Sequence, residues 1–253
     1  MPAIVLLPGL DGTGTLLLDV AAALGTEFEV IVVSYPSDSA LDYVALESFV
    51  RSRLPSNQSF VLVAESFSGP IAISIASSNL TGLAGLALCC SFARCPRPTF
   101  RLLGGLIPLI RTSRLPAFAA RGLLFGRWSN DQLLGALREA LAKVSAAVVR
   151  ARLRSVVSVD VLAKLRSVAV PMVYVRAIND RLVPASAARL IMRNASAVRL
   201  IQLEGPHCLL EVAASSVAPV VLEFVRSLGL TSNLPLNRTV SGGRPSAPAG
   251  TAG

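Results

Sequence analysis

The chain has 253 residues, of which 53% are hydrophobic, and its formal net charge is +9. This length suits one domain with a single buried core, and no apolar run reaches the ~18 residues of a membrane span. A membrane-spanning protein is therefore excluded. Residues 1–10 are apolar but lack a basic n-region and a small-residue cleavage site, so we expect a first strand there and a cytoplasmic protein.

The four cysteines do not suggest a structural role for sulfur. Cys89 and Cys90 are adjacent, and neither they nor Cys95 and Cys208 have the spacing of metal ligands. Buried thiols are therefore expected rather than a disulfide framework or a zinc site. Neither a metal nor an organic cofactor is expected.

The positive charge lies in the middle of the chain. Residues 97–166 contain 13 Lys or Arg and 3 Asp or Glu, a balance of +10, whereas the remainder has 11 basic and 12 acidic residues, a balance of −1. Such a segment can attract an anionic substrate group, an acidic acyl-carrier protein or a phospholipid surface. It can equally be a solvated helical face in an Arg-rich chain. Aromatic residues are few there and no binding motif is present, so nucleic acid is not an expected partner.

Apolar periodicity predicts strands that alternate with helices. The strands are expected at residues 3–7, 29–34, 60–64, 83–89, 171–177 and 197–203, and the helices at residues 16–24, 41–54, 69–77, 186–194 and 212–228. This alternation is typical of an α/β protein with a mostly parallel sheet and helices on both faces. Residues 97–166 show only helical pattern and are predicted to form an inserted helical cap. The core would then comprise residues 1–96 and 167–229, and residues 230–253, rich in Ser, Pro and Gly, are expected to be disordered.

The sharpest local motif surrounds Ser66. An apolar strand ends in Ala64-Glu65-Ser66-Phe67-Ser68, and a helix follows at once. A nucleophile on so tight a turn needs small residues two positions before and after it, and Ala64 and Ser68 meet that requirement. The alternative is an ordinary strand-to-helix turn with a helix-capping serine.

A base and an acid follow Ser66 in the chain order Ser, acid, His. His207 is the only histidine, and it lies in a Gly-Pro loop directly after the last strand. An imidazole can activate a serine hydroxyl at neutral pH. Asp180 follows the preceding strand and could orient that imidazole. Asp160 and Glu204 are weaker candidates for the acid, since Asp160 lies in helical sequence and Glu204 lies at the wrong end of its loop.

A glycine-rich stretch, residues 7–14, follows the first strand. Its spacing is G-x-x-G-x-G rather than the G-x-G-x-x-G of dinucleotide-binding proteins, and no acidic residue ends the next strand, which disfavours a dinucleotide-binding oxidoreductase. The lysine of a phosphate-binding P-loop is absent too. We therefore interpret the stretch as an oxyanion loop, whose backbone N–H faces developing negative charge.

Together these elements resemble the α/β-hydrolase superfamily over residues 3–229, and in particular small bacterial serine carboxylesterases with a Pro-Gly-Leu-Asp-Gly loop and a helical cap. The resemblance implies that the backbone N–H groups of Leu10 and Phe67 form the oxyanion hole. It also implies a sheet of about six strands in the family order 4-3-5-6-7-8, without the two N-terminal strands of many relatives. Pro8 replaces the usual His, and Ala64 and Ser68 replace the usual glycines.

The expected activity is hydrolysis of carboxylic esters through an acyl-enzyme on Ser66. A thioesterase or an acyltransferase that acts on acyl-carrier or CoA substrates is the first alternative, and a catalytically inactive binding protein of the same fold is the second. The expected partner is a small ester with an apolar acyl group. Its pocket would be formed by apolar cap residues: Leu102, Leu103, Leu106, Ile107, Leu109, Ile110, Leu123, Leu124 and Phe125.

Overall fold

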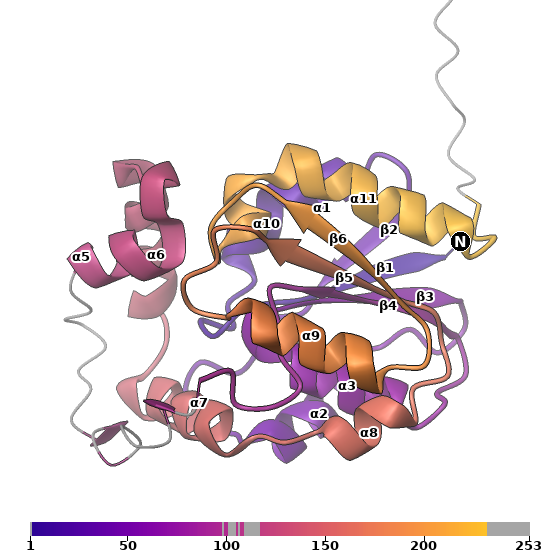
Figure 1. Cartoon of the computed structure of the whole chain (residues 1–253), viewed down its shortest axis with the longest axis horizontal. Coiled ribbons are helices and arrows are strands. Elements are labelled where there is room, and N and C mark those ends of the chain that lie inside the picture. Colours follow the sequence, from indigo (N-terminus) through magenta and orange to yellow (C-terminus); the bar gives the residue numbers. More distant parts are fainter. Residues whose placement is uncertain (1, 98, 101–104, 106, 109–116, 232–253) are drawn as a thin grey trace, which may run out of the picture.

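Six strands form one parallel sheet at the centre of the molecule (Figure 1). The computed structural model describes residues 2–97, 99–100, 105, 107–108 and 117–231. The strands follow the spatial order β2-β1-β3-β4-β5-β6, and every neighbouring pair is parallel. They are β1 (Ala3–Leu7), β2 (Glu29–Val32), β3 (Phe60–Glu65), β4 (Leu83–Cys89), β5 (Met172–Ala177) and β6 (Val198–Leu203).

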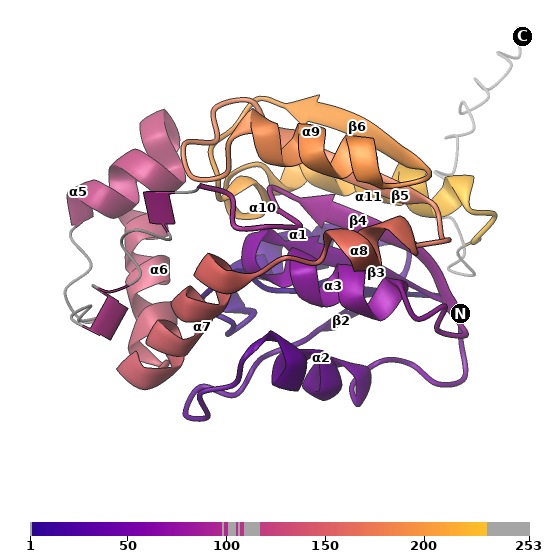
Figure 2. The same ribbon diagram turned by 60° about the horizontal axis from the view of Figure 1, so that its bottom comes forward.

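The central strands are apolar along their whole length because both faces of the sheet are covered. Every residue of β1 and β3 is buried, whereas the edge strand β6 exposes about every second residue. Figures 1 and 2 show the two helical layers on either side of the sheet. One layer contains α1 (Leu18–Leu24), α10 (Leu209–Val212) and α11 (Ala214–Ser227), and the other contains α2 (Tyr43–Arg51), α3 (Gly69–Ala76), α8 (Leu162–Arg166) and α9 (Ala185–Asn194).

Three further helices, α5 (Ala117–Ala120), α6 (Asp131–Ala142) and α7 (Ala146–Ser158), lie beyond the carboxyl ends of the strands (Figure 1). Polar side chains determine where α6 and α7 begin. Asn130 Oδ1 accepts a hydrogen bond from Leu133 N at 2.8 Å, and Ser145 Oγ accepts one from Val148 N at 3.3 Å. Such caps satisfy backbone donors that have no partner within the helix. Shorter turns are found at Thr15–Leu17, Ser66–Ser68, Arg121–Phe125 and Gly126–Trp128.

Several cations of residues 97–166 contact the rest of the molecule. On the surface these contacts join Arg97 to the carbonyl oxygens of Arg181 and Leu182, Arg127 to Glu204, Lys164 to Glu47 and Ser74, and Arg166 to Asn194. Individual exposed ion pairs of this kind stabilise a protein little. Their number indicates that part of the positive charge attaches this segment to the core.

The predicted class, strand order and helical layers are confirmed. The strand predicted at residues 60–64 continues to Glu65, and the helix predicted at residues 212–228 is α11, which the short helix α10 precedes. None of the helices in the described part of the chain has the length and apolarity that a membrane crossing needs. The predicted disorder of residues 232–253 lies outside the described residues, as do Leu102, Leu103, Leu106, Leu109 and Ile110.

Candidate active site

Ser66 is the first residue after β3 and has an unusual backbone conformation. Its φ of 44° lies in the left-handed region, which costs energy for a residue with a side chain. A side-chain hydrogen bond stabilises this turn: Ser91 Oγ donates to the Ser66 carbonyl at 2.6 Å. A Cβ on Gly69 would lie 1.8 Å from Ser91 Oγ, so that position requires glycine. This strained turn presents the Ser66 side chain at the end of the sheet, as a nucleophile requires.

Ser68 contributes a hydroxyl that glycine at this position would lack. Its Oγ donates a short hydrogen bond to the Pro8 carbonyl, which begins the glycine-rich loop after β1. Tyr35 Oη donates in turn to Ser68 Oγ at 2.6 Å. Burial raises the pKa of Tyr35 well above its usual value, so the phenol stays protonated as a donor. The turn at Ser66 and the glycine-rich loop are therefore joined by side-chain hydrogen bonds.

Ser66, His207 and Asp180 form a hydrogen-bonded series. Ser66 Oγ lies 2.8 Å from His207 Nε2, and His207 Nδ1 lies 2.9 Å from Asp180 Oδ2. The side chains of His207 and Asp180 are only 5% and 2% exposed. Asp180 Oδ1 accepts the backbone N–H groups of Leu182 and Val183, both at 2.8 Å, which fixes the carboxylate. In this arrangement an imidazole with its proton on Nδ1 can accept the serine proton at Nε2.

The loop after β1 determines where the Leu10 N–H points. Gly12 N donates to the Gly9 carbonyl at 3.1 Å, so that carbonyl faces into the turn. Because the peptide is trans, the Leu10 N–H points the opposite way, out of the turn. Phe67 N is the other predicted donor, and it lies at the start of the helical turn after Ser66, where backbone N–H groups have no helical partner. Both residues line the same cavity as Ser66.

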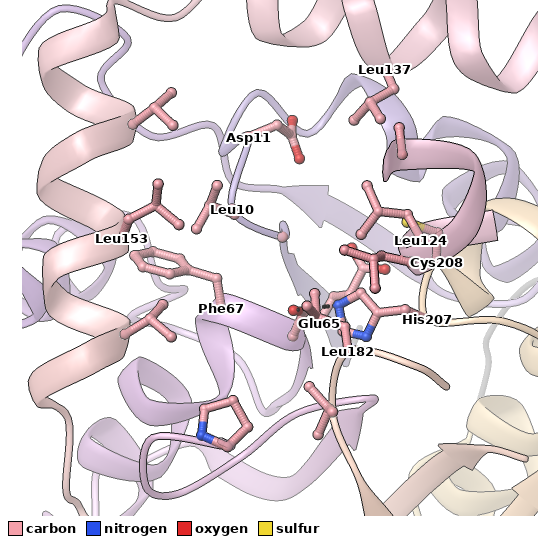
Figure 3. A pocket seen from close by; sticks show the side chains of 18 of the residues that line it. Leu10, Asp11, Glu65, Phe67, Leu124, Leu137, Leu153, Leu182, His207 and Cys208 are labelled. Atoms are coloured by element: carbon pink, nitrogen blue, oxygen red, sulfur yellow. Dashed lines mark hydrogen bonds between the residues drawn. The ribbon is translucent and has the colours of Figure 1, made fainter. Parts of the chain in front are cut away.

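This cavity has a volume of about 440 Å³ and opens over Ser66 and His207. Figure 3 shows Phe67 and Leu153 to the left of the His207 ring, and Leu124, Leu137 and Cys208 above it. Most of the described lining residues are apolar. Those from residues 97–166 include Ile107, Leu123, Leu124, Leu137, Leu141, Val149 and Leu153, whereas Phe125 is buried behind the wall. The cavity can enclose an apolar group of several carbons next to the serine.

Three carboxyl groups, those of Asp11, Glu65 and Glu211, also line the cavity. The Glu65 and Glu211 carboxyls are buried near each other and interact, and two neighbouring buried carboxylates favour a proton on the pair. Burial, together with the neighbouring Asp11 carboxylate, raises the pKa of both carboxyls, and that of Glu211 reaches about 7. At neutral pH the pair therefore carries less negative charge than two free carboxylates.

Sequence reasoning identified Ser66, His207 and Asp180 and the loop at Leu10, and the structure brings all of them to one end of the sheet. The weaker acid candidates lie elsewhere, Asp160 beside Arg94 and Glu204 beside Arg127. Sequence reasoning did not identify Glu65 or Glu211 as part of the site. The available signals were the place of Glu65 directly before Ser66 and the spacing of four residues between His207 and Glu211.

Among the described residues, no group of three or more His, Cys, Asp or Glu side chains is placed to hold a metal ion. The four cysteines are free and buried. Burial raises the pKa of Cys208, which lies next to His207, so its thiol stays protonated and unreactive.

A family model described as the alpha/beta hydrolase family matches residues 4–220. The chain belongs to this family. No curated protein is similar enough in sequence to count as a match.

Solved structures of α/β hydrolases are similar in fold. A thermophilic esterase from Thermogutta terrifontis is 17% identical, with a TM-score of 0.77 over 90% of each chain. An esterase from Exiguobacterium antarcticum is 15% identical, with a TM-score of 0.78 over 89% of this chain and 92% of that one. The enol-lactonase from Burkholderia xenovorans LB400 is 16% identical, with a TM-score of 0.74 over 89% and 91%. At these identities the likeness establishes the fold.

Proposed function

We propose that the protein is a serine hydrolase that cleaves carboxylic esters through an acyl-enzyme on Ser66. The observation that carries this proposal is the continuous series from Ser66 Oγ through His207 to Asp180 at the mouth of an apolar cavity. The solved structures of the same fold that are named as esterases and as an enol-lactonase support it, because such names denote cleavage of an ester bond. No cofactor is needed for this chemistry.

In the first half of the reaction, Ser66 Oγ attacks the ester carbonyl carbon while its proton passes to His207 Nε2. The carbonyl oxygen becomes an oxyanion that accepts hydrogen bonds from the Leu10 and Phe67 N–H groups. The C–O bond to the alcohol then breaks, and the alcohol leaves with the proton from Nε2. Asp180 stabilises the imidazolium that exists between these two proton transfers.

In the second half, water attacks the acyl-enzyme and gives a proton to His207 Nε2. The tetrahedral intermediate collapses, the carboxylic acid leaves, and the proton returns to Ser66 Oγ. Exclusion of bulk water by the apolar cavity wall strengthens the hydrogen bonds to the oxyanion.

The helices α5, α6 and α7 act as a cap whose apolar side chains bind the acyl group, whereas α8 covers the sheet. This role is supported by the lining residues on α6 and α7, which lie opposite Ser66 across the cavity. The substrate is then a small ester with an apolar acyl chain of several carbons. An acyl-carrier protein as the donor, acyl transfer to an alcohol other than water, and a location in the bacterial cytoplasm stay predictions.

Covalent labelling with a fluorophosphonate tests the proposal directly. The wild-type protein should be labelled on Ser66 and should hydrolyse p-nitrophenyl esters. Ser66→Ala should lose labelling and about 10⁴-fold or more in kcat, because the three residues act as a unit. Ser52→Ala, which changes an exposed serine at the C-terminal end of α2, serves as the matched control and should behave as wild type.

A wild-type protein that is folded but neither labelled nor active would favour an inactive binding protein. Product ratios that depend on an added acceptor alcohol would favour an acyltransferase, and a strong preference for acyl-CoA or acyl-carrier substrates would favour a thioesterase. Full activity of pure Ser66→Ala protein would overturn the assignment of the nucleophile.

A further inference from the structure

Arg152 is a charged residue of α7 whose side chain is only 1% exposed. Its guanidinium leaves the helix and enters the core beneath the glycine-rich loop. Nη1 donates to the carbonyl oxygens of Leu10 and Asp11 at 2.9 and 2.6 Å, and Nη2 donates to the Pro36 carbonyl at 3.0 Å. The guanidinium carbon also lies 5.6 Å from the centre of the Tyr35 ring.

A buried cation in this position has to be compensated by its surroundings. Removing a charged group from water is strongly unfavourable unless hydrogen bonds and opposite charge replace the water. Burial lowers the pKa of Arg152, and the Asp11 carboxylate opposes that shift and favours the charged form. A hydrophobic side chain would pack in the same space without this cost, so packing alone gives no reason for an arginine.

Arg152 binds the carbonyl oxygens of Leu10 and Asp11. These belong to the two peptide units that come directly after the one that contains the Leu10 N–H. The Gly9 carbonyl accepts from Gly12 N, and the next two carbonyls accept from Arg152. Both carbonyl oxygens carry partial negative charge. If they were free to turn toward the cavity, they would repel an oxyanion and displace the Leu10 N–H that has to face it.

Gly12 is fitted to this arrangement in two ways. Its φ of +70° favours glycine, and a Cβ there would lie 2.4 Å from Arg152 Nη1. The loop therefore adopts its shape around the guanidinium, and a side chain at position 12 would occupy the same space.

We propose that Arg152 is a positioning residue for the oxyanion hole, which holds the loop carbonyls away from the cavity so that the Leu10 N–H faces the developing oxyanion. This inference rests on the proposed esterase function. It also means that the inserted segment acts on the reacting atoms through a hydrogen-bonded loop, in addition to binding the acyl group.

The test is Arg152→Ala, with Arg154→Ala as the matched control on the exposed face of the same helix. For a short neutral ester, Arg152→Ala should lose about 10²-fold in kcat, comparable to loss of an oxyanion donor, while KM changes less than about threefold. An alkyl trifluoromethyl ketone forms a tetrahedral oxyanion on the serine, so its Ki should rise in parallel with the loss in kcat/KM. Millimolar guanidinium should restore part of the activity of Arg152→Ala and should leave wild type and Arg154→Ala unchanged.

If Arg152→Ala does not fold, Arg152→Met fills the same space without the hydrogen bonds, and the same loss in kcat and in ketone affinity is expected. A folded Arg152 variant with wild-type kcat, or with a raised KM alone, would overturn the inference. If Ser66→Ala is inactive while Arg152→Ala matches Arg154→Ala, this inference alone is wrong. If Ser66→Ala is active, the proposed function itself is wrong.

Discussion

The loops at the carboxyl ends of the strands and the helices α6 and α7 form opposite walls of one cavity, but they contribute different kinds of groups. The loops provide Ser66, Asp180 and His207, each fixed by hydrogen bonds within 3 Å. The helices line the cavity with leucine and valine side chains. Proton transfer needs exact distances and directions, whereas contact with an acyl chain is non-directional. Changes in the loops should therefore lower kcat, and changes in the helical wall should alter substrate selection.

The largest effect on the loop side is expected for Asp180→Asn. An amide keeps the shape of the side chain but cannot stabilise the imidazolium, and it favours the wrong tautomer of His207. We expect a loss of about 10⁴-fold in kcat with a nearly unchanged KM, measured by steady-state ester hydrolysis. Asp160→Asn, which alters the exposed pair with Arg94, is the control and should stay within twofold of wild type. An Asp180→Asn enzyme with more than a tenth of wild-type kcat would contradict the expectation that the loop residues determine kcat.

On the helical side, Leu153→Trp should act on selection. Leu153 lines the cavity from α7 (Figure 3), so a larger ring there shortens the space for the acyl chain. Each buried methylene contributes about 0.8 kcal/mol, so exclusion of two or three of them lowers kcat/KM for an octanoyl ester by about 10- to 100-fold. Hydrolysis of an acetyl ester should be nearly unchanged.

Leu153→Met conserves volume and should leave the acyl-length profile as in wild type. Equal losses for acetyl and octanoyl esters in Leu153→Trp would show that the helical wall affects the chemistry itself rather than the acyl group.

The smallest effect concerns the carboxyl pair on the loop side. Glu211 has a pKa of about 7 in the folded protein against 4.5 for a free carboxyl, so the folded state holds a proton that the unfolded chain has already lost. Stability is then full below about pH 4.5 and falls as the pH rises toward about 7, by at most about 1.4 kcal/mol per pH unit. Glu211→Gln removes this titration, so its unfolding free energy should vary less between pH 5 and 7.

Urea unfolding at several pH values measures this difference. Glu223→Gln, an exposed carboxyl paired with Arg199, should keep the wild-type slope. If the unfolding free energy of Glu211→Gln varies with pH as steeply as that of wild type, Glu211 is not the group that holds the proton.

The sequence predicted those positions of the candidate site that depend on local pattern. Ser66, Asp180 and His207 each follow a strand whose apolar run is evident, and parallel strands bring such positions to one edge. Ser68 could be recognised as small, but its hydrogen bond to Pro8 spans 60 residues and depends on how β1 and β3 lie together.

Arg152 could not be found in this way. It is one of 22 arginines, and its contact with Leu10 joins positions 142 residues apart. The helical pattern of residues 97–166 predicts that α7 exists but not where it rests on the core. The proton shared by Glu65 and Glu211 likewise follows from how closely α10 approaches β3, which no spacing along the chain reveals.

The contact between Gly12 and Arg152 limits how this scaffold can be re-engineered. Caps of α/β hydrolases are attractive modules to exchange when a new substrate range is wanted. A transplanted cap without an arginine at this position would leave the carbonyls of Leu10, Asp11 and Pro36 without their donor inside the molecule. A chimera that keeps α7 of this chain and replaces only the segment before it preserves that donor. Helix α7 and the glycine-rich loop are thus matched to each other, and the boundary for a productive graft lies before Ala146 rather than at residue 166.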